Sequence, residues 1–223
     1  MSTSAQRLGR AMPRHQLNAI IEALRGRRKV ARVVTPGGTT PRGYPPSRKC
    51  EGPRFQSLVE DDCVRVLEIA SIVTATTTHP FVLDIEGMDG PTSYTPDVLV
   101  WMQDEGALFE FKPAGKLASH KVARRLREVA RGLASHGIEL VLMLDEDVRA
   151  NGLQRELKEL QRLRPARGRF RGDLDPNAWD PLYRQAVDEE LLERWRRAQR
   201  TCDELLTRVM RRDPEDLLPT PNN

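Results

Sequence analysis

Two carboxylates and a lysine lie within a pair of strand-like runs near the middle of the chain. The first run, residues 97–102, opens with Asp97 and is rich in Val, Leu and Trp, and the second, residues 107–112, reads ALFEFK. β-Branched and aromatic residues favour strands, and the DEG sequence before the second run is typical of a turn. The sequence therefore predicts an antiparallel hairpin. Glu110 and Lys112 are two residues apart, so they share one face of their strand.

The register of this hairpin decides whether Asp97 joins the other two side chains. With a four-residue loop at residues 103–106, Met102 pairs with Ala107 and Asp97 lies opposite Lys112. A slip of one residue would turn Asp97 to the other face. In the four-residue register both carboxylates and the lysine gather on a half-buried face, where the carboxylates need a neutralising cation.

A Glu-x-Lys pair alone is more typical of a solvent-facing strand. The combination of Pro96-Asp97 with Glu110-Phe111-Lys112 across a hairpin resembles the signature of PD-(D/E)xK nucleases. Asp97 and Lys112 are fifteen residues apart, which is about the length of one hairpin. Because such a short motif also occurs by chance, the flanking segments must support it.

Length and composition limit the class of protein. The chain has 223 residues, of which 30% are charged and 5% aromatic, enough for one well-buried domain with an appendage or for two small domains. No apolar run approaches the roughly 20 residues of a membrane span, and the N-terminus shows no hydrophobic signal segment. The three cysteines are scattered without a C-x-x-C motif, which indicates a reducing compartment and neither a disulfide framework nor a zinc site.

Charge is strongly segregated along the chain. Residues 1–49 carry eleven Lys or Arg and one acid, whereas residues 50–115 carry three basic and twelve acidic residues. A basic arm beside an acidic centre suits a metal-dependent enzyme that acts on a polyanion. A basic terminus is also often only a solubilising tail, so the arm alone does not decide between the two.

The segments around the hairpin predict the elements that position it. Helical patterns occupy residues 15–24, 55–69 and 116–135, and strand patterns occupy residues 72–78, 81–85 and 138–144. Their order predicts an α/β sandwich with a mixed sheet. Ser57 and Glu60 form a capping box, so Glu60 is either a helix cap or a third carboxylate of the site, and the local pattern favours the cap. A lone histidine before proline, His79, is more often structural than a ligand.

Several segments, in their order along the chain, resemble the TnsA endonuclease subunit of heteromeric transposases. They read PRGYPPSRK, FQSLVE, HP (His79-Pro80), YTPDVLV, EFK and LDEDVRANGLQRELKELQRL, and the resemblance covers roughly residues 42–163. The resemblance implies a restriction-endonuclease-like core at residues 42–148, with a basic helix and linker at residues 1–41. A helical region for partner or DNA contacts would follow at residues 149–223.

By the same resemblance, Glu60, Asp97, Glu110 and Lys112 are the catalytic residues. Asp97 would bridge metal ions, Glu110 and the Phe111 backbone carbonyl would complete one site, and Glu60 would hold a second ion or its water. The ion would be Mg²⁺, with Mn²⁺ able to substitute, and Lys112 would orient the attacking water or stabilise the pentavalent phosphate. The family also uses Gln at the position of Glu110, and it is expected to have Gln where His79 stands.

The implied function is phosphodiester hydrolysis that cleaves the 5′ strands at the ends of a mobile element, in the bacterial cytoplasm. The implied partners are double-stranded DNA at the transposon ends, a DDE-type transposase subunit and an AAA+ ATPase regulator. The chain has no Walker A motif and no DDE spacing, so other chains must supply those activities. Two alternatives stay open: a restriction- or repair-type nuclease outside transposition, and a catalytically silent DNA-binding or scaffold module.

The C-terminal segment predicts one long helix. From Val187 an apolar stripe recurs at steps of three and four residues, and Asp213-Pro214 ends it. The stripe is buried either against the chain's own core or against a partner. Because the family's C-terminal part docks its regulator, deleting residues 181–223 is expected to cost activation by partners more than folding. The stretch from Arg162 to Arg171 is rich in arginine and is a second candidate for DNA contacts.

Overall fold

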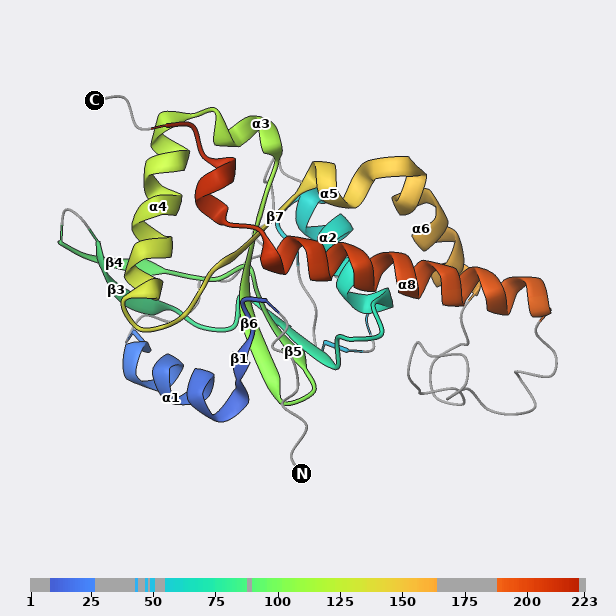
Figure 1. Cartoon of the computed structure of the whole chain (residues 1–223), viewed down its shortest axis with the longest axis horizontal. Coiled ribbons are helices and arrows are strands. Elements are labelled where there is room, and N and C mark those ends of the chain that lie inside the picture. The colour runs from blue at the N-terminus through green and yellow to red at the C-terminus, as the bar shows by residue number, and fades with distance from the viewer. Residues whose placement is uncertain are drawn as a thin grey trace.

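The structure is a computed structural model, and it describes residues 9–26, 43, 47, 49–50, 55–87, 90–163 and 188–220. Much of the predicted basic arm with its linker, and the arginine-rich stretch after Leu163, lie outside the described residues. The chain is a mixed α/β protein in which helices cover both faces of a five-stranded sheet (Figure 1). The predicted α/β class with a mixed sheet is confirmed.

The five-stranded sheet is built around strand β6. This strand pairs antiparallel with β5 and β1 and parallel with β7, and β2 pairs antiparallel with β5. The strands of this sheet are β1 (Met12–Pro13), β2 (Ala75–Thr78), β5 (Val98–Met102), β6 (Glu105–Lys112) and β7 (Val141–Leu144). The β6–β7 pair is the parallel part of the mixed sheet, and all four residues of β7 are buried, as its continuous apolar run predicted.

Strands β3 (Leu83–Gly87) and β4 (Gly90–Tyr94) form a separate two-stranded antiparallel sheet. The sequence predicted a strand at residues 81–85, where β3 lies, and none where β4 lies. Gly and Pro at the start of the GPTSY sequence of β4 are poor strand formers, which explains the omission. β4 leads directly into the bend that precedes β5 and carries Asp97.

The central hairpin of β5 and β6 is present, but its register differs from the prediction by two residues. Met102 pairs with Glu105, so the loop consists of Gln103 and Asp104 instead of four residues. A shift of two residues preserves the face of every side chain, whereas a shift of one would reverse it. Asp97 therefore keeps its predicted face.

Gly106 explains the wrong register. This glycine lies within β6 opposite Trp101, not in the turn. A Cβ at Gly106 would lie 2.4 Å from the Trp101 ring and 2.9 Å from a methyl group of Leu17. The absence of a side chain thus makes room for an aromatic ring on the neighbouring strand.

The helices lie on the two faces of the sheet. They are α1 (Arg14–Leu24), α2 (Leu58–Ile69), α3 (Ala114–Leu117), α4 (His120–Ala134), α5 (Asp145–Arg149), α6 (Leu153–Leu163) and α8 (Glu189–Arg211), with short 3₁₀ turns η1 (Ala150–Gly152) and η3 (Pro214–Leu217). Residues of α1 and α4 pack with β3 in one hydrophobic cluster, and residues of α2, α6 and α8 pack in another. None of the described helices has the length and apolar character needed to cross a membrane.

Two helix predictions need correction. The helix predicted at residues 116–135 is two helices, α3 and α4. α3 is a separate turn at whose start the Ala114 N–H donates to Asp145 Oδ1 at 2.8 Å. The helix predicted at residues 55–69 begins only at Leu58, which is 55% exposed. Leu58 is the first residue of α2 and lies ahead of the buried part of the helix, which begins at Val59.

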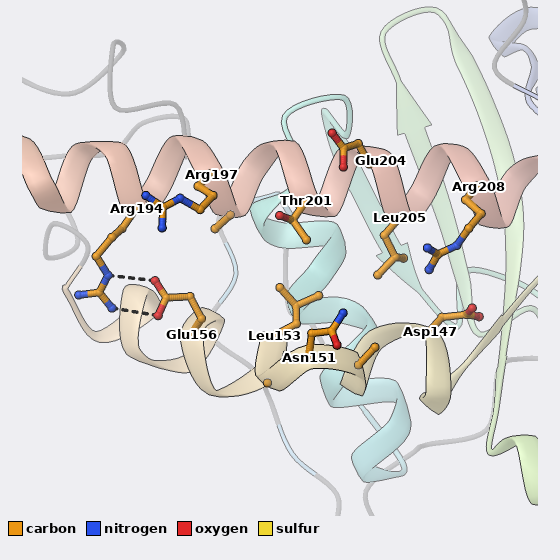
Figure 2. A pocket seen from close by; sticks show the side chains of 13 residues that line it. Asp147, Asn151, Leu153, Glu156, Arg194, Arg197, Thr201, Glu204, Leu205 and Arg208 are labelled. Carbon is orange, nitrogen blue, oxygen red and sulfur yellow. Dashed lines mark hydrogen bonds and ion pairs between the residues drawn. The ribbon is translucent and has the colours of Figure 1, made fainter.

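Helix α8 is the predicted C-terminal helix, and its apolar stripe is buried in the chain's own core. Trp195 and Cys202 are 0% exposed and belong to the same cluster as the α2 residues. Arg194 donates to both carboxylate oxygens of Glu156 on α6, each at 3.0 Å, which fixes α8 beside α6 (Figure 2). Of the two options left open by the sequence, the structure shows burial against the core. Deleting residues 181–223 would remove this packing, so the expectation that the deletion costs activation by partners more than folding is not supported.

A groove of about 410 Å³ lies between α8 and the segment from α5 to α6 (Figure 2). Leu153 and Leu205 supply apolar lining, and Arg197 and Arg208 lie along the α8 side. None of the four predicted catalytic residues lines this groove. The groove and the predicted site are therefore separate features of the molecule.

The described N-terminal segment closes against the end of α8. The Arg10 N–H donates to the Met210 carbonyl at 3.2 Å, and Arg10 Nε donates to the Arg212 carbonyl at 3.0 Å. Gly9 has a φ of 54°, and a Cβ there would lie 2.5 Å from the Met210 carbonyl oxygen. Glycine is therefore required where these two segments meet.

Candidate metal centre

The structure brings the four predicted side chains together at one end of the sheet. Glu60 lies in the first turn of α2, Asp97 lies in the bend before β5, and Glu110 and Lys112 lie at the end of β6. Lys112 Nζ donates to Glu110 Oε1 and is 3.7 Å from Asp97 Oδ2. Glu60 is close enough that the charges of Lys112 and Glu110 act on its carboxylate. Elements far apart in the sequence thus converge on one cluster.

The backbone of Phe111 contributes to the same cluster. Its N–H donates to Asp97 Oδ2 at 2.7 Å, which fixes the Asp97 carboxylate against β6. Its carbonyl oxygen, a predicted metal ligand, accepts a hydrogen bond from Lys112 Nζ at 3.0 Å. Lys112 therefore contacts the predicted oxygen ligands on β6.

Tyr94 belongs to the cluster although the sequence analysis assigned it no role. Its hydroxyl donates to Glu110 Oε2 at 2.7 Å. Burial and the Glu110 carboxylate raise the pKa of Tyr94 well above its ordinary value, so the hydroxyl remains protonated and a donor. Its position, three residues before Asp97 in the YTPD sequence, was the only sequence signal for this contact.

Glu60 acts both as a helix cap and as a member of the cluster. The Glu60 N–H donates to Ser57 Oγ at 3.2 Å, and the Glu60 carboxylate accepts from Ser57 Oγ at 3.2 Å and from the Gln56 N–H at 2.8 Å. These bonds are the reciprocal contacts of a capping box, with one difference. The Glu60 carboxylate accepts the N–H of Gln56, which lies one residue before the Ser57 cap. The same carboxylate is 3.6 Å from His79 Nε2. The two roles weighed from the sequence are therefore compatible.

His79 lies beside Glu60 and Asp97. A ligand atom from each of these three residues lies within 4.8 Å of the other two. The backbone N–H of His79 donates to the backbone carbonyl of Asp97 at 2.9 Å. His79 has a φ of 45°, which is uncommon for a residue other than glycine. The backbone thus holds the imidazole at the carboxylates.

The electrostatics of the cluster favour a bound cation. Burial, followed by the charge of Glu110, raises the pKa of Asp97 well above its ordinary value, although Lys112 opposes this shift. Burial also raises the pKa of Glu60. Burial lowers the pKa of Lys112, but the neighbouring carboxylates outweigh it and raise that pKa overall. One lysine therefore does not balance three carboxylates, and their oxygen atoms, with the Phe111 carbonyl, are the hard ligands that suit Mg²⁺ or Mn²⁺.

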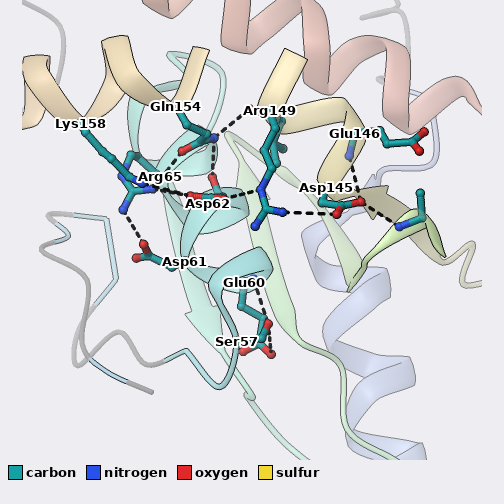
Figure 3. A network of polar contacts seen from close by, with 12 residues as sticks. Ser57, Glu60, Asp61, Asp62, Arg65, Asp145, Glu146, Arg149, Gln154 and Lys158 are labelled. Carbon is teal, nitrogen blue, oxygen red and sulfur yellow. Dashed lines mark hydrogen bonds and ion pairs between the residues drawn. The ribbon is translucent and has the colours of Figure 1, made fainter. Parts of the chain in front are cut away.

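A buried ionic network holds α2 against α6 (Figure 3). Arg65 of α2 donates to Asp62 Oδ1 at 3.0 Å and to Gln154 Oε1 of α6 at 2.9 Å. All three side chains are buried. Because each charge has a partner, the network fixes the helix that begins with the Glu60 cap.

The network continues toward Lys112. Arg149 of α5 donates to Asp62 Oδ2 at 2.8 Å and pairs with Asp145 at 3.4 Å (Figure 3). Asp145 in turn accepts the Ala114 N–H, two residues after Lys112. A continuous set of polar contacts therefore links the helix that carries Glu60 to the strand end that carries Lys112.

The raised pKa of Asp97 predicts a pH dependence of stability. The folded chain binds a proton at Asp97 more tightly than the unfolded chain, so stability falls as pH rises from the ordinary pKa of 3.8 toward the raised folded value. We expect the metal-free chain to lose stability over this interval and the Asp97→Asn variant to lose less. Urea denaturation in chelator across pH 4 to 8 would measure this difference. Equal pH slopes for the two chains would contradict the assignment.

No protein-family model matches this sequence, and a search of curated proteins finds no relative of it.

Proposed function

We propose that this chain is a metal-dependent DNA endonuclease of the TnsA type, which cleaves the 5′ strands at the ends of a mobile element. The observation that supports the proposal is the convergence of Glu60, Asp97, Glu110 and Lys112 on one under-neutralised cluster. These are the residue types that the PD-(D/E)xK signature requires, and they come from a helix start and two paired strands. The finer fold assignment, a restriction-endonuclease-like core, belongs to the same proposal.

The chemistry divides among the residues of the cluster. Asp97, Glu110, Glu60 and the Phe111 carbonyl would hold Mg²⁺ or Mn²⁺. A bound divalent ion would lower the pKa of a water molecule and neutralise phosphate oxygens. Lys112 is placed to orient the attacking water or to stabilise the charge of the pentavalent phosphate. Tyr94 keeps Glu110 oriented by donating to one of its oxygens, which leaves the other oxygen facing the lysine.

The proposed partners are double-stranded transposon ends, a DDE-type transposase and an AAA+ ATPase. The experiment that tests the function incubates the purified full chain with a supercoiled plasmid that carries the element ends. We expect metal-dependent nicking at the 5′ ends that increases when both partners are added. Nicking that ignores the partners would favour a restriction- or repair-type nuclease. The lack of nicking under every condition would favour a catalytically silent DNA-binding module.

A substitution of Glu60 separates its capping role from its metal role. Glu60→Gln keeps a carbonyl oxygen that accepts the Gln56 N–H, so the stability should change by no more than about 1 kcal/mol, the usual worth of a cap. Cleavage should fall by more than about 100-fold, because even the partners of metal ligands contribute about 10–100-fold. Plasmid nicking and urea denaturation on the same preparations would measure both quantities.

Ser57→Ala is the matched control for this test. It removes the hydroxyl that accepts the Glu60 N–H and donates to the Glu60 carboxylate, and it retains the carboxylate itself with its hydrogen bond from the Gln56 N–H. We expect a loss of stability of about 1 kcal/mol with most of the cleavage retained. If the Glu60→Gln chain cleaves as well as the Ser57→Ala chain, Glu60 acts only as a helix cap and not as a metal ligand.

A further inference from the structure

His79 brings a nitrogen donor to a cluster that otherwise offers oxygen atoms. It lies between β2 and Pro80, and 7% of the residue is exposed. Its left-handed backbone conformation is unfavourable for a residue other than glycine, so the surrounding contacts must offset this strain. The hydrogen bond from the His79 N–H to the Asp97 carbonyl is one such contact. The strain is thus located where the ring meets the carboxylates.

The spacing of the donor atoms suits a metal ion. His79 Nε2 is 3.6 Å from Glu60 Oε2, and one ligand atom each of Glu60, His79 and Asp97 lie within 4.8 Å of one another. Ligands at about 2.0–2.2 Å from a common ion are separated by about 3–4 Å, depending on the angle between them. The three side chains therefore need only small movements to share one ion.

The hydrogen bond from Gln56 indicates which nitrogen would bind. Gln56 Nε2 is 3.2 Å from His79 Nε2. An amide nitrogen is only a donor, so this contact is a hydrogen bond when His79 Nε2 carries the lone pair. The same nitrogen faces Glu60 Oε2. A bound ion would take this lone pair in place of the Gln56 amide.

We propose that Glu60, His79 and Asp97 form a mixed nitrogen–oxygen site that selects Mn²⁺ over Mg²⁺. This inference rests on the proposed function and makes it more specific. Imidazole is a good ligand for first-row transition metals, whereas Mg²⁺ is held mainly by oxygen ligands and water. Later first-row ions bind such a nitrogen–oxygen set more tightly than Mn²⁺ does, so the selectivity proposed here is that of Mn²⁺ over Mg²⁺ alone. Glu110 and Phe111 would then serve the oxygen-only side of the cluster.

Direct detection of nitrogen on the bound ion tests the site. Mn²⁺ is added to the full chain, and electron spin-echo envelope modulation reports whether a ¹⁴N nucleus is coupled to it. We expect this coupling in the wild type and in His136→Gln, which changes an exposed histidine at the end of α4. We expect it to disappear in His79→Gln. Growth with ¹⁵N-histidine should change the wild-type signal, so the test does not depend on the folding of a variant.

Calorimetric titration with Mn²⁺ and Mg²⁺ gives a second readout. The wild type and His136→Gln should bind Mn²⁺ at least about tenfold more tightly than Mg²⁺, and His79→Gln should lose this preference. The expected size follows from the about 10–100-fold in metal affinity that groups around a metal contribute.

The outcomes separate this inference from the proposed function. Bound Mn²⁺ without ¹⁴N coupling, or an unchanged preference in His79→Gln, would overturn the nitrogen ligand and leave a metal-dependent nuclease intact. Bound Mn²⁺ with the coupling, in a chain that never nicks DNA even with its partners, would support the site and overturn the nuclease. A wild-type chain that binds neither ion would overturn both.

Discussion

Asp97→Asn and Lys112→Ala should each lower metal-dependent cleavage by about a thousandfold. Stabilisation of charge by a bound ion is worth several kcal/mol, and each 1.36 kcal/mol corresponds to about a tenfold change in rate. The Asp97 carboxylate accepts the Phe111 N–H of β6, and one of its oxygens lies within 4.8 Å of a ligand atom of Glu60 on α2. Asp97 is therefore the side chain best placed to share an ion between β6 and α2. Lys112 contacts both Glu110 and Asp97 and is the only cation whose contact with these two carboxylates we find among the described residues. Initial rates of plasmid nicking would measure both losses.

The two variants should have opposite effects on the stability of the metal-free chain. Asp97→Asn removes one charge from an under-neutralised cluster, so the free energy of unfolding at neutral pH should rise. Lys112→Ala leaves the carboxylates without their cation, so the free energy of unfolding should fall. Equal losses of cleavage with opposite changes in stability could not be attributed to unfolding.

Asp104→Asn is the matched control for this pair. Asp104 lies in the exposed turn of the same hairpin, at the opposite end from the cluster. We expect its cleavage and stability to match those of the wild type. Retained cleavage by a folded Asp97→Asn chain would exclude the proposed site.

Trp195→Ala should destabilise the chain by about 3–5 kcal/mol, the usual cost of removing a large buried aromatic side chain. Trp195 is 0% exposed and lies in the cluster that joins α8 to α2 and the sheet. Urea denaturation should show a lower midpoint, and any loss of nicking should follow the loss of folded protein. This result is expected only if α8 is part of the core.

Arg197→Ala is the control on the same helix. Arg197 is exposed and lies two residues from Trp195, so its truncation should change stability by no more than about 0.5 kcal/mol. If Trp195→Ala is no more destabilising than Arg197→Ala, the stripe of α8 is not buried in the chain and a partner surface becomes the better interpretation.

The sequence predicted the elements of the site better than their register. Helix α2 has both a clear start at Ser57 and a strong apolar pattern, and its bounds were predicted to within three residues. The hairpin was placed correctly, but Gly106 was assigned to the turn because glycine is common in turns. Its true role depends on the ring of Trp101, which belongs to the neighbouring strand. Such a contact between strands has no local signature in the sequence.

Contacts that depend on the tertiary structure could not be predicted from the sequence. Tyr94 and His79 reach the carboxylates only because β4 and the bend after β2 approach the end of β6. The burial of Arg65 and Asp62 was also unpredicted, because charged residues on a helix usually face solvent. In each case the physical reason lies in another part of the chain.

The junction of Arg10 with Met210 and Arg212 has a consequence for synthesis of the protein. All the site residues have been synthesised once the ribosome reaches residue 112. The fold, however, closes only when the end of α8 is available to the N-terminal segment. The ribosome must add 119 residues between the end of α2 at Ile69 and the start of α8 at Glu189. At about 5–20 residues per second this takes about 6–24 s, during which the apolar surface that α8 covers stays open on the nascent chain. Closure of the fold around the site is thus tied to the synthesis of α8 rather than to the synthesis of the site residues.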